Sequence, residues 1–194
     1  MKRLITLGLG LLLVVSLLGI AQAADNDSVY VYVTVTGVLA VDILETELDF
    51  TSVSANSTSV LSSSATVRNT SDGITEDYRI KGSNSSPSNW TIASAATGPS
   101  EDQFVLYAAF HNTQPADSDA TWTDDDLEAT NQDCTTSVFS IDNTQSGVDV
   151  PANNPGDYSP SGSDRGMWFR IKTPTSLTVG SGIAQTITVT VTAY

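Results

Sequence analysis

Residues 183–194 alternate almost without interruption between apolar and threonine side chains. Because successive side chains of a β-strand point to opposite faces, this alternation predicts a strand with one dry and one solvated face. The dry face would carry Ile187, Val189, Val191 and Ala193. Such a strand needs further strands to cover its dry face, so the chain is expected to fold as a β-protein.

Residues 29–36 repeat this pattern near the other end of the chain. Val29, Val31, Val33 and Val35 would share one face, while tyrosine and threonine side chains would share the other. Two long, two-faced strands therefore bracket the sequence.

Two segments between them are candidates for the centre of a sheet. Residues 104–110 form the most continuous apolar run after the first 23 residues, which predicts a strand covered on both faces. Residues 166–172 alternate, so one set of side chains should point inward and the other outward. The inward set is Met167, Phe169 and Ile171, and the outward set is Trp168, Arg170 and Lys172.

Turn signals divide the chain into about nine to eleven short strands, and no segment has a sustained helical period. Asp72-Gly73, for example, predicts a hairpin between residues 65–69 and 74–81. The expected fold is all-β: a single antiparallel β-sandwich of immunoglobulin-like or jelly-roll-like type. Residues 111–160, rich in Asp, Asn, Ser, Thr, Gly and Pro, are expected to form a long acidic insertion.

Residues 1–23 have the order of a secretory signal peptide, with a basic start, an apolar run and the small-residue site Ala21-Gln22-Ala23. We expect cleavage after Ala23, one mature domain at residues 24–194, and a secreted or cell-surface location of bacterial type. Retention as an N-terminal anchor is the alternative. Cleavage removes two of the 8 basic residues and none of the 22 acidic ones, so the formal charge changes from −14 to about −16. Such a surface repels nucleic acid and anionic lipid, so neither is expected as a partner of the mature chain.

Catalytic groups are scarce. His111 is the single histidine and Cys134 the single cysteine, and no motif places them together. The sequence also lacks a glycine-rich phosphate loop, so we expect no enzyme and no zinc site. Cys134 excludes an intramolecular disulfide but leaves burial, modification or a cross-link between two copies open.

One acidic stretch has the spacing of a calcium loop. Oxygen-bearing side chains stand at its positions one, three, five, nine and twelve, although Trp122 stands where such loops have glycine. Calcium is therefore the one cofactor that we consider, against the alternative of a solvated acidic loop. The candidate ligands are Asp117, Asp119, Thr121, Asp125 and Glu128.

The layout of four elements resembles secreted bacterial immunoglobulin-like surface proteins, including the WxL group. These elements are Leu48-Asp49-Phe50, a strand ending in residues 69–73, Trp90-Thr91-Ile92 and the final valine-threonine strand. The resemblance spans most of the mature chain and rests on spacing and composition. The Trp-x-Leu element is present only as Trp90-Thr91-Ile92, so the peptidoglycan binding of that group is not carried over.

These observations favour a secreted, non-enzymatic structural protein: a subunit of a filament, surface layer or matrix. A terminal strand that leaves its own sheet can complete a sheet of a neighbour, so the partner would be a second copy or another cell-surface component. Residues 29–36 are the better donor because cleavage would free them. The alternative function is a carbohydrate- or cell-wall-binding adhesion module, with Trp168, Tyr30 and Tyr32 as exposed aromatic platforms. A secreted hydrolase is the third interpretation, since carboxylates are plentiful.

Overall fold

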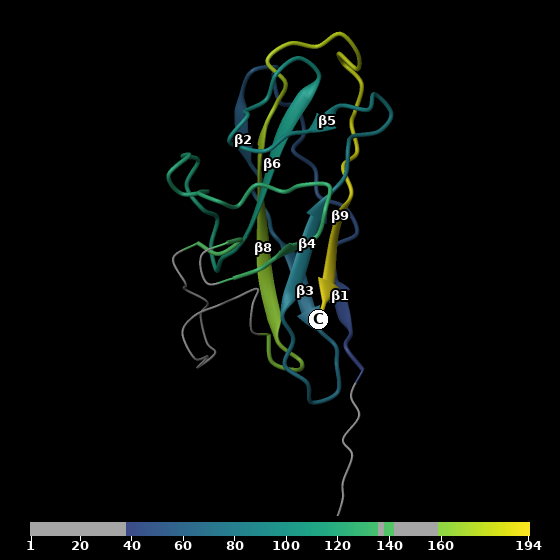
Figure 1. Cartoon of the computed structure of the whole chain (residues 1–194), viewed down its shortest axis with the longest axis vertical. Helices are drawn as coiled ribbons and strands as arrows, with labels where there is room; N and C mark the ends of the chain where they lie inside the picture. The colour runs from purple at the N-terminus through teal and green to yellow at the C-terminus, as the bar shows by residue number, and fades with distance from the viewer. Residues whose placement is uncertain (1–37, 136–137, 142–158) are drawn as a thin grey trace, which may run out of the picture. The chain divides into compact units, whose positions relative to one another are not determined.

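The structure, a computed structural model, describes residues 38–135, 138–141 and 159–194, which belong to one compact unit, Thr36–Tyr194. These residues form an all-β fold of two sheets without a helix, and so without a helix able to cross a membrane (Figure 1). The strands are β1 (Val41–Ile43), β2 (Thr58–Val60), β3 (Ala65–Asn69), β4 (Tyr78–Gly82), β5 (Thr91–Ile92), β6 (Gln103–Phe110), β7 (Gln132–Asp133), β8 (Asp164–Lys172) and β9 (Val189–Ala193).

The larger sheet is built around β6 and β8. Its strand order is β1-β3-β8-β6-β5, and all pairs are antiparallel except β5 with β6. β2 and β3 pair with successive halves of one edge of β8, and the Leu61 N–H continues the ladder between them by donating to the Phe169 carbonyl over 3.0 Å. β8 therefore has neighbours along both edges.

The smaller sheet has the order β7-β4-β9, with Ile80 of β4 opposite Val191 of β9. The predicted closing strand is confirmed, although its ladder covers Val189–Ala193 and not the whole alternating stretch. Val191 is buried and Thr192 is exposed, as the alternation requires.

One hydrophobic core is shared by the two sheets. Val67 of β3, Phe104 of β6 and Phe169 of β8 contribute to it from the larger sheet, and Ile80 and Val191 contribute from the smaller one. The apolar run of β6 also has a second buried face. The prediction that residues 104–110 form a strand covered on both faces is therefore confirmed.

The outward assignment of Trp168 and Arg170 is wrong. Trp168 is 8 % exposed and Arg170 is 3 % exposed, because the segment that follows β6 covers this face of the sheet. Trp122 of that segment lies edge-on to Tyr107, with ring centroids 6.3 Å apart, and its indole N–H donates to the Ala116 carbonyl. The face of β8 that the alternation predicted to be solvated therefore belongs to a second hydrophobic core.

The predicted hairpin at Asp72-Gly73 is also wrong. β3 belongs to the larger sheet and β4 to the smaller one, so the turn between them crosses from sheet to sheet. The buried side chain of Asn69 holds this turn: its amide N–H donates to the Ile74 carbonyl, and its oxygen accepts from the Ser71 N–H. These bonds turn the chain away from its own strand.

The packing of β9 predicts opposite effects for two neighbouring substitutions. Val191→Asp should destabilise the domain by more than about 3 kcal/mol, because it buries a charge without a partner. Thr192→Asp should be tolerated, because this exposed side chain lies opposite Arg79. Thermal melts of both variants check the assignment, and equal melting temperatures would contradict it.

Candidate functional site

The edge strands of the two sheets, β1 and β9, lie next to each other on one side of the domain (Figure 1). Each is hydrogen-bonded along one edge only, to β3 and β4 respectively. An edge strand presents a row of backbone groups to which another strand can add. The strip between these two free edges is the candidate site, and we refer to it as the seam.

The hydrogen-bond pattern of β9 shows which backbone groups face the seam. Tyr194 and Asp77 exchange backbone bonds of 3.0 and 3.4 Å, and the Thr186 N–H donates to the Ser86 carbonyl. Even-numbered residues therefore bond toward β4. Because backbone direction alternates in an antiparallel ladder, the N–H and C=O groups of Val189 and Val191 point to the free edge.

β1 has the same parity. The Leu44 N–H donates to the Thr66 carbonyl, and the Thr70 N–H donates to the Ala40 carbonyl, so even-numbered residues bond toward β3. The backbone groups of Val41 and Ile43 consequently point away from β3, to the free edge of β1.

The core is incompletely covered at this seam. The apolar side chains of β3, β4, β6 and β8 that face the shared core are buried, whereas most of those on β1 and β9 are only partly buried. Val41, Ile43, Val189 and Ala193 all belong to this partly buried set, as does Ile187 just before β9. In these residues the backbone N–H and C=O groups face a free edge, and the side chains are only partly buried.

Residues 46–55, which follow β1, do not form a ladder of backbone hydrogen bonds with either edge strand of the seam. The side chains of Leu48, Phe50 and Val53 pack partly buried against the core. Among the described contacts, Thr51 is the one residue between 46 and 55 whose N–H has a protein acceptor, the nearby Asp49 carboxylate. The segment covers apolar surface without offering a paired strand.

A buried carboxylate fixes the start of β1. The Ala40 N–H donates to Glu76 Oε1 over 2.6 Å, and the Glu76 side chain is fully buried, which raises its pKa. Glu76 is followed by Asp77, the partner of Tyr194. Val38 and Leu39, which precede Ala40, therefore belong to the side of the domain where β9 ends.

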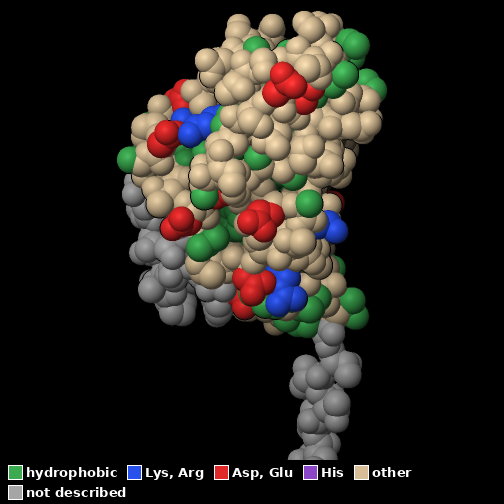
Figure 2. All heavy atoms as spheres, turned by 45° about the horizontal axis from the view of Figure 1, so that its top comes forward, with side chains coloured by type: hydrophobic (Ala, Val, Ile, Leu, Met, Phe, Trp, Pro, Cys, Tyr) green, Lys and Arg blue, Asp and Glu red, His purple; other side chains and the backbone are tan. Residues whose placement is uncertain are grey.

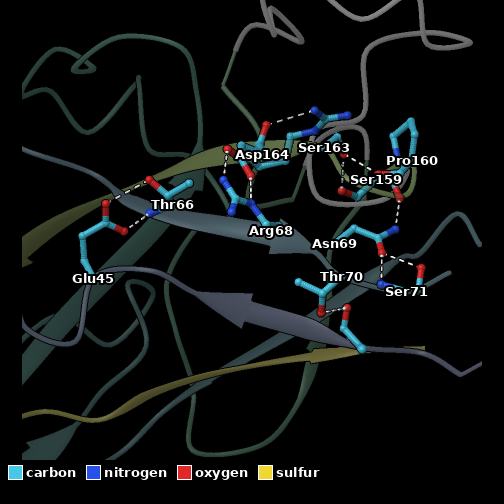
Figure 3. Close-up of polar contacts among 12 residues, drawn as sticks. Glu45, Thr66, Arg68, Asn69, Thr70, Ser71, Ser159, Pro160, Ser163 and Asp164 are labelled. Atoms are coloured by element: carbon cyan, nitrogen blue, oxygen red, sulfur yellow. Dashed lines mark hydrogen bonds and ion pairs between the residues drawn. The ribbon is translucent and has the colours of Figure 1, made fainter.

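Further polar contacts lock the neighbouring strand ends (Figure 3). Arg68 of β3 forms a two-pronged bond with Asp164 of β8, at 2.6 and 2.7 Å. The Glu45 carboxylate accepts from both the backbone and the hydroxyl of Thr66, and these bonds lower its pKa despite partial burial. β1, β3 and β8 are thus held in fixed register beside the seam.

The four donor valines, Val29, Val31, Val33 and Val35, lie outside the described residues, as do Tyr30 and Tyr32. The donor strand therefore stays a prediction, and sequence reasoning did not predict the seam, because which strands become edges depends on pairings between distant segments. Trp168 is buried in one cluster with Trp122, so it does not form the exposed aromatic platform that the sequence predicted.

The candidate calcium ligands have different partners. Asp117 and Asp119 accept from Arg170 over 2.8 Å each, and Asp119 also pairs with Lys172 over 2.9 Å. Thr121 bonds to Ser118, and Glu128 is exposed. Within the described residues, no group of three or more His, Cys, Asp or Glu side chains is arranged to hold a metal ion. The calcium loop stays a prediction.

These two cations of β8 lie over the ring of Tyr107, with Arg170 at 5.1 Å and Lys172 at 5.7 Å from its centroid. The acidic segment thus neutralises basic side chains on the second face of the sheet, and basic side chains on the face in Figure 2 lie beside acidic ones. Asp117 and Asp119 therefore have a structural role with or without a metal.

His111 lies directly after β6, and Cys134 lies directly after β7. The imidazole Nδ1 of His111 lies 2.7 Å from the Thr113 carbonyl two residues away. Cys134 is buried in the shared core, which favours burial over a cross-link between copies among the alternatives left open.

Comparisons with protein-family models, with curated proteins and with solved structures found no match to this chain. The resemblance to WxL-type surface proteins therefore stays a prediction.

Asp125 gives a pH dependence that can be tested. Its carboxylate accepts from the Phe139 N–H over 2.6 Å, yet burial raises its pKa from 3.8 to about 8. Since the folded state holds this proton more tightly than the unfolded chain, the stabilising effect is full below pH 3.8 and is lost as the pH rises through about 8.

The variant Asp125→Asn removes this titration. Its melting temperature, relative to that of the unsubstituted protein, should rise steadily between pH 4 and pH 8. The exposed-site variant Asp72→Asn serves as the control and should show a constant difference. A difference for Asp125→Asn that does not change with pH would contradict the assignment.

Proposed function

We propose that this protein is a secreted, non-enzymatic structural subunit that assembles into a filament, surface layer or matrix by donating residues 29–36 to the seam of a second copy. The observation that carries the proposal is the coincidence, at one seam, of free strand edges and an incompletely covered core. We take the two sheets with their shared core to be an antiparallel β-sandwich, of immunoglobulin-like or jelly-roll-like type.

Length and pattern support this pairing. Eight residues of extended chain span about 26 Å, and the seven residues from Ile187 to Ala193 span about 23 Å. An added strand would accept and donate hydrogen bonds along the free edge of β9. Its alternate valines would point to the same side as Val189 and Ala193 and complete the core there.

The β9 side of the seam lacks lysine, proline and inward-pointing charge, whereas β1 is protected by its short length of three residues. Natural edge strands are blunted by lysine, proline or inward-pointing charge. Residues 187–193 contain none of these, and β1 contains only Asp42. The free edge of β9 could therefore pair with a strand from another copy, and that strand would also cover apolar side chains of the core.

Donor and acceptor are different surfaces of the same chain, so the contact is heterologous. A heterologous contact forms an open polymer unless its rotation happens to close a ring. A filament or sheet-like array is therefore the expected product, and not a symmetric dimer.

The central test is negative-stain electron microscopy of residues 24–194 beside a variant that lacks residues 24–36. The longer chain should form filaments and the shorter one should not, because only the longer one carries the donor strand. A synthetic peptide of residues 29–36 should raise the melting temperature of the shorter variant. A peptide with Val31→Asp and Val33→Asp is the control and should leave it unchanged. Monodisperse particles from the longer chain under all conditions would refute strand donation.

The same preparation tests the calcium loop. Millimolar calcium should raise the melting temperature of the longer chain if the loop binds this ion. An unchanged melting temperature with and without calcium would argue against binding.

Two proline variants test the acceptor edge. Val189→Pro removes an N–H that points to the seam and leaves the bonds from β9 to β4 in place, so the domain should fold but form no filaments. Thr190→Pro removes an N–H directed at β4 and should lower the stability of the isolated domain markedly. Melting temperatures and micrographs of both variants are the readouts. Normal filaments from Val189→Pro would exclude β9 as the acceptor.

A further inference from the structure

The loop between β8 and β9 exposes apolar side chains at the end of the domain where β9 begins. Val179 is 47 % exposed and Ile183 is 55 % exposed. Apolar side chains are visible at the upper right of the face drawn in Figure 2. Val179 and Ile183 flank one tight turn, in which the Ile183 N–H donates to the Gly180 carbonyl over 3.1 Å, and neighbouring exposed apolar side chains can form an interaction surface.

Polar contacts hold this loop in one conformation. The Asp102 carboxylate accepts from the N–H and hydroxyl of Thr178 and from the Val179 N–H, and its pKa is lowered, chiefly by the Thr178 hydroxyl. The indole N–H of Trp90 donates to the Val179 carbonyl over 3.0 Å. The Gln185 amide N–H donates to the Ile183 carbonyl. A preorganised loop loses little entropy when it binds.

The other end of the domain has a matching pair. Val38 is 77 % exposed and Leu39 is 44 % exposed, and one residue, Gly37, separates them from the donor segment in the chain. They precede β1, whose first residue Val41 lies opposite Asn69 near the start of β8. The β8–β9 loop begins where β8 ends, eight residues after its first residue, so the two apolar pairs are separated by about 26 Å of strand.

We propose that Val38 and Leu39 of one copy dock on Val179 and Ile183 of the next, so that copies stack head to tail. This inference rests on the proposed function and adds its orientation. If Val29 of the donor lies opposite Ala193 of the acceptor and Thr36 lies opposite Thr186, the same antiparallel register brings Leu39 opposite Ile183 in the acceptor's β8–β9 loop. The donor strand then runs antiparallel to β9.

The opposite orientation is less favourable. A donor that ran parallel to β9 would bring two β1 ends together and leave Val179 and Ile183 in water. Parallel ladders are also slightly weaker per residue than antiparallel ones. Head-to-tail stacking covers both exposed pairs and forms the antiparallel ladder with β9, the longer of the two edge strands.

Disulfide trapping in filaments distinguishes the two orientations. In a Cys134→Ala background, which removes the single native thiol, we would prepare Leu39→Cys, Ile183→Cys and the double variant. Electron microscopy under reducing conditions first establishes that each forms filaments. After oxidation, a non-reducing gel should show a ladder of oligomers for the double variant and monomers for each single variant. Mixing the two single variants should produce dimers.

The outcomes separate this inference from the proposed function. Dimers from Leu39→Cys alone would place two β1 ends together and overturn head-to-tail docking while strand donation stands. Filaments without any cross-link in the double variant would overturn the loop contact. Absence of filaments from the background protein under reducing conditions would instead refute the proposed function itself.

A second measurement avoids engineered thiols. The variant carrying Val179→Ser and Ile183→Ser should fold normally, since both side chains are exposed, but should raise the critical concentration for assembly about tenfold or more. Ala184→Ser at a neighbouring exposed position is the control and should leave that concentration unchanged. An unchanged critical concentration in the double serine variant would overturn the docking site.

Discussion

Backbone N–H and C=O groups that leave water must find other partners, and on β1 and β9 half of these groups face a single seam. The strand geometry ties this to the core, because backbone direction and side-chain direction both alternate with a period of two. Residues such as Val41 and Val189 therefore direct their backbone to the free edge and their side chains to the core. An added strand would complete both at once. β4, β6 and β8 have no comparable need, since each has neighbours on both edges.

The acidic segment after β6 is part of the fold and not only a solvated insertion. Its backbone pairs with β6, where the Ala108 N–H donates to the Asp125 carbonyl and the Leu127 N–H donates to the Leu106 carbonyl. Trp122 then closes the second face of the sheet. Arg170 can be buried there because Asp117 and Asp119 supply compensating charge. The ion pairs with β8 thus explain the acidic residues Asp117 and Asp119 of this stretch.

The sequence predicted what depends on local alternation and missed what depends on distant segments. The faces of β9 and the doubly covered β6 follow from side-chain periodicity alone. Alternation says which side chains share a face but not whether another segment covers it, so Trp168 was placed on the surface. The turn at Asp72-Gly73 has the composition of a hairpin, yet the buried Asn69 directs the chain into the other sheet. The seam could not be predicted for the same reason, because a strand is an edge only if no other segment of the chain pairs with it.

Electrostatics limits the ways in which such a chain can associate. Copies with a formal charge of −14 repel one another, and the repulsion decays over about 8 Å at physiological ionic strength. Arg68, Arg79, Arg170 and Lys172 are paired with carboxylates of their own chain, so they offer little attraction to a second copy. Association must then depend on short-range contacts that carry no charge. In the assembly proposed above, residues 187–193 and the apolar pair Val179 and Ile183 would supply such contacts, as backbone hydrogen-bonding groups and apolar surface, and the uncharged residues 29–36 would be their chemical complement.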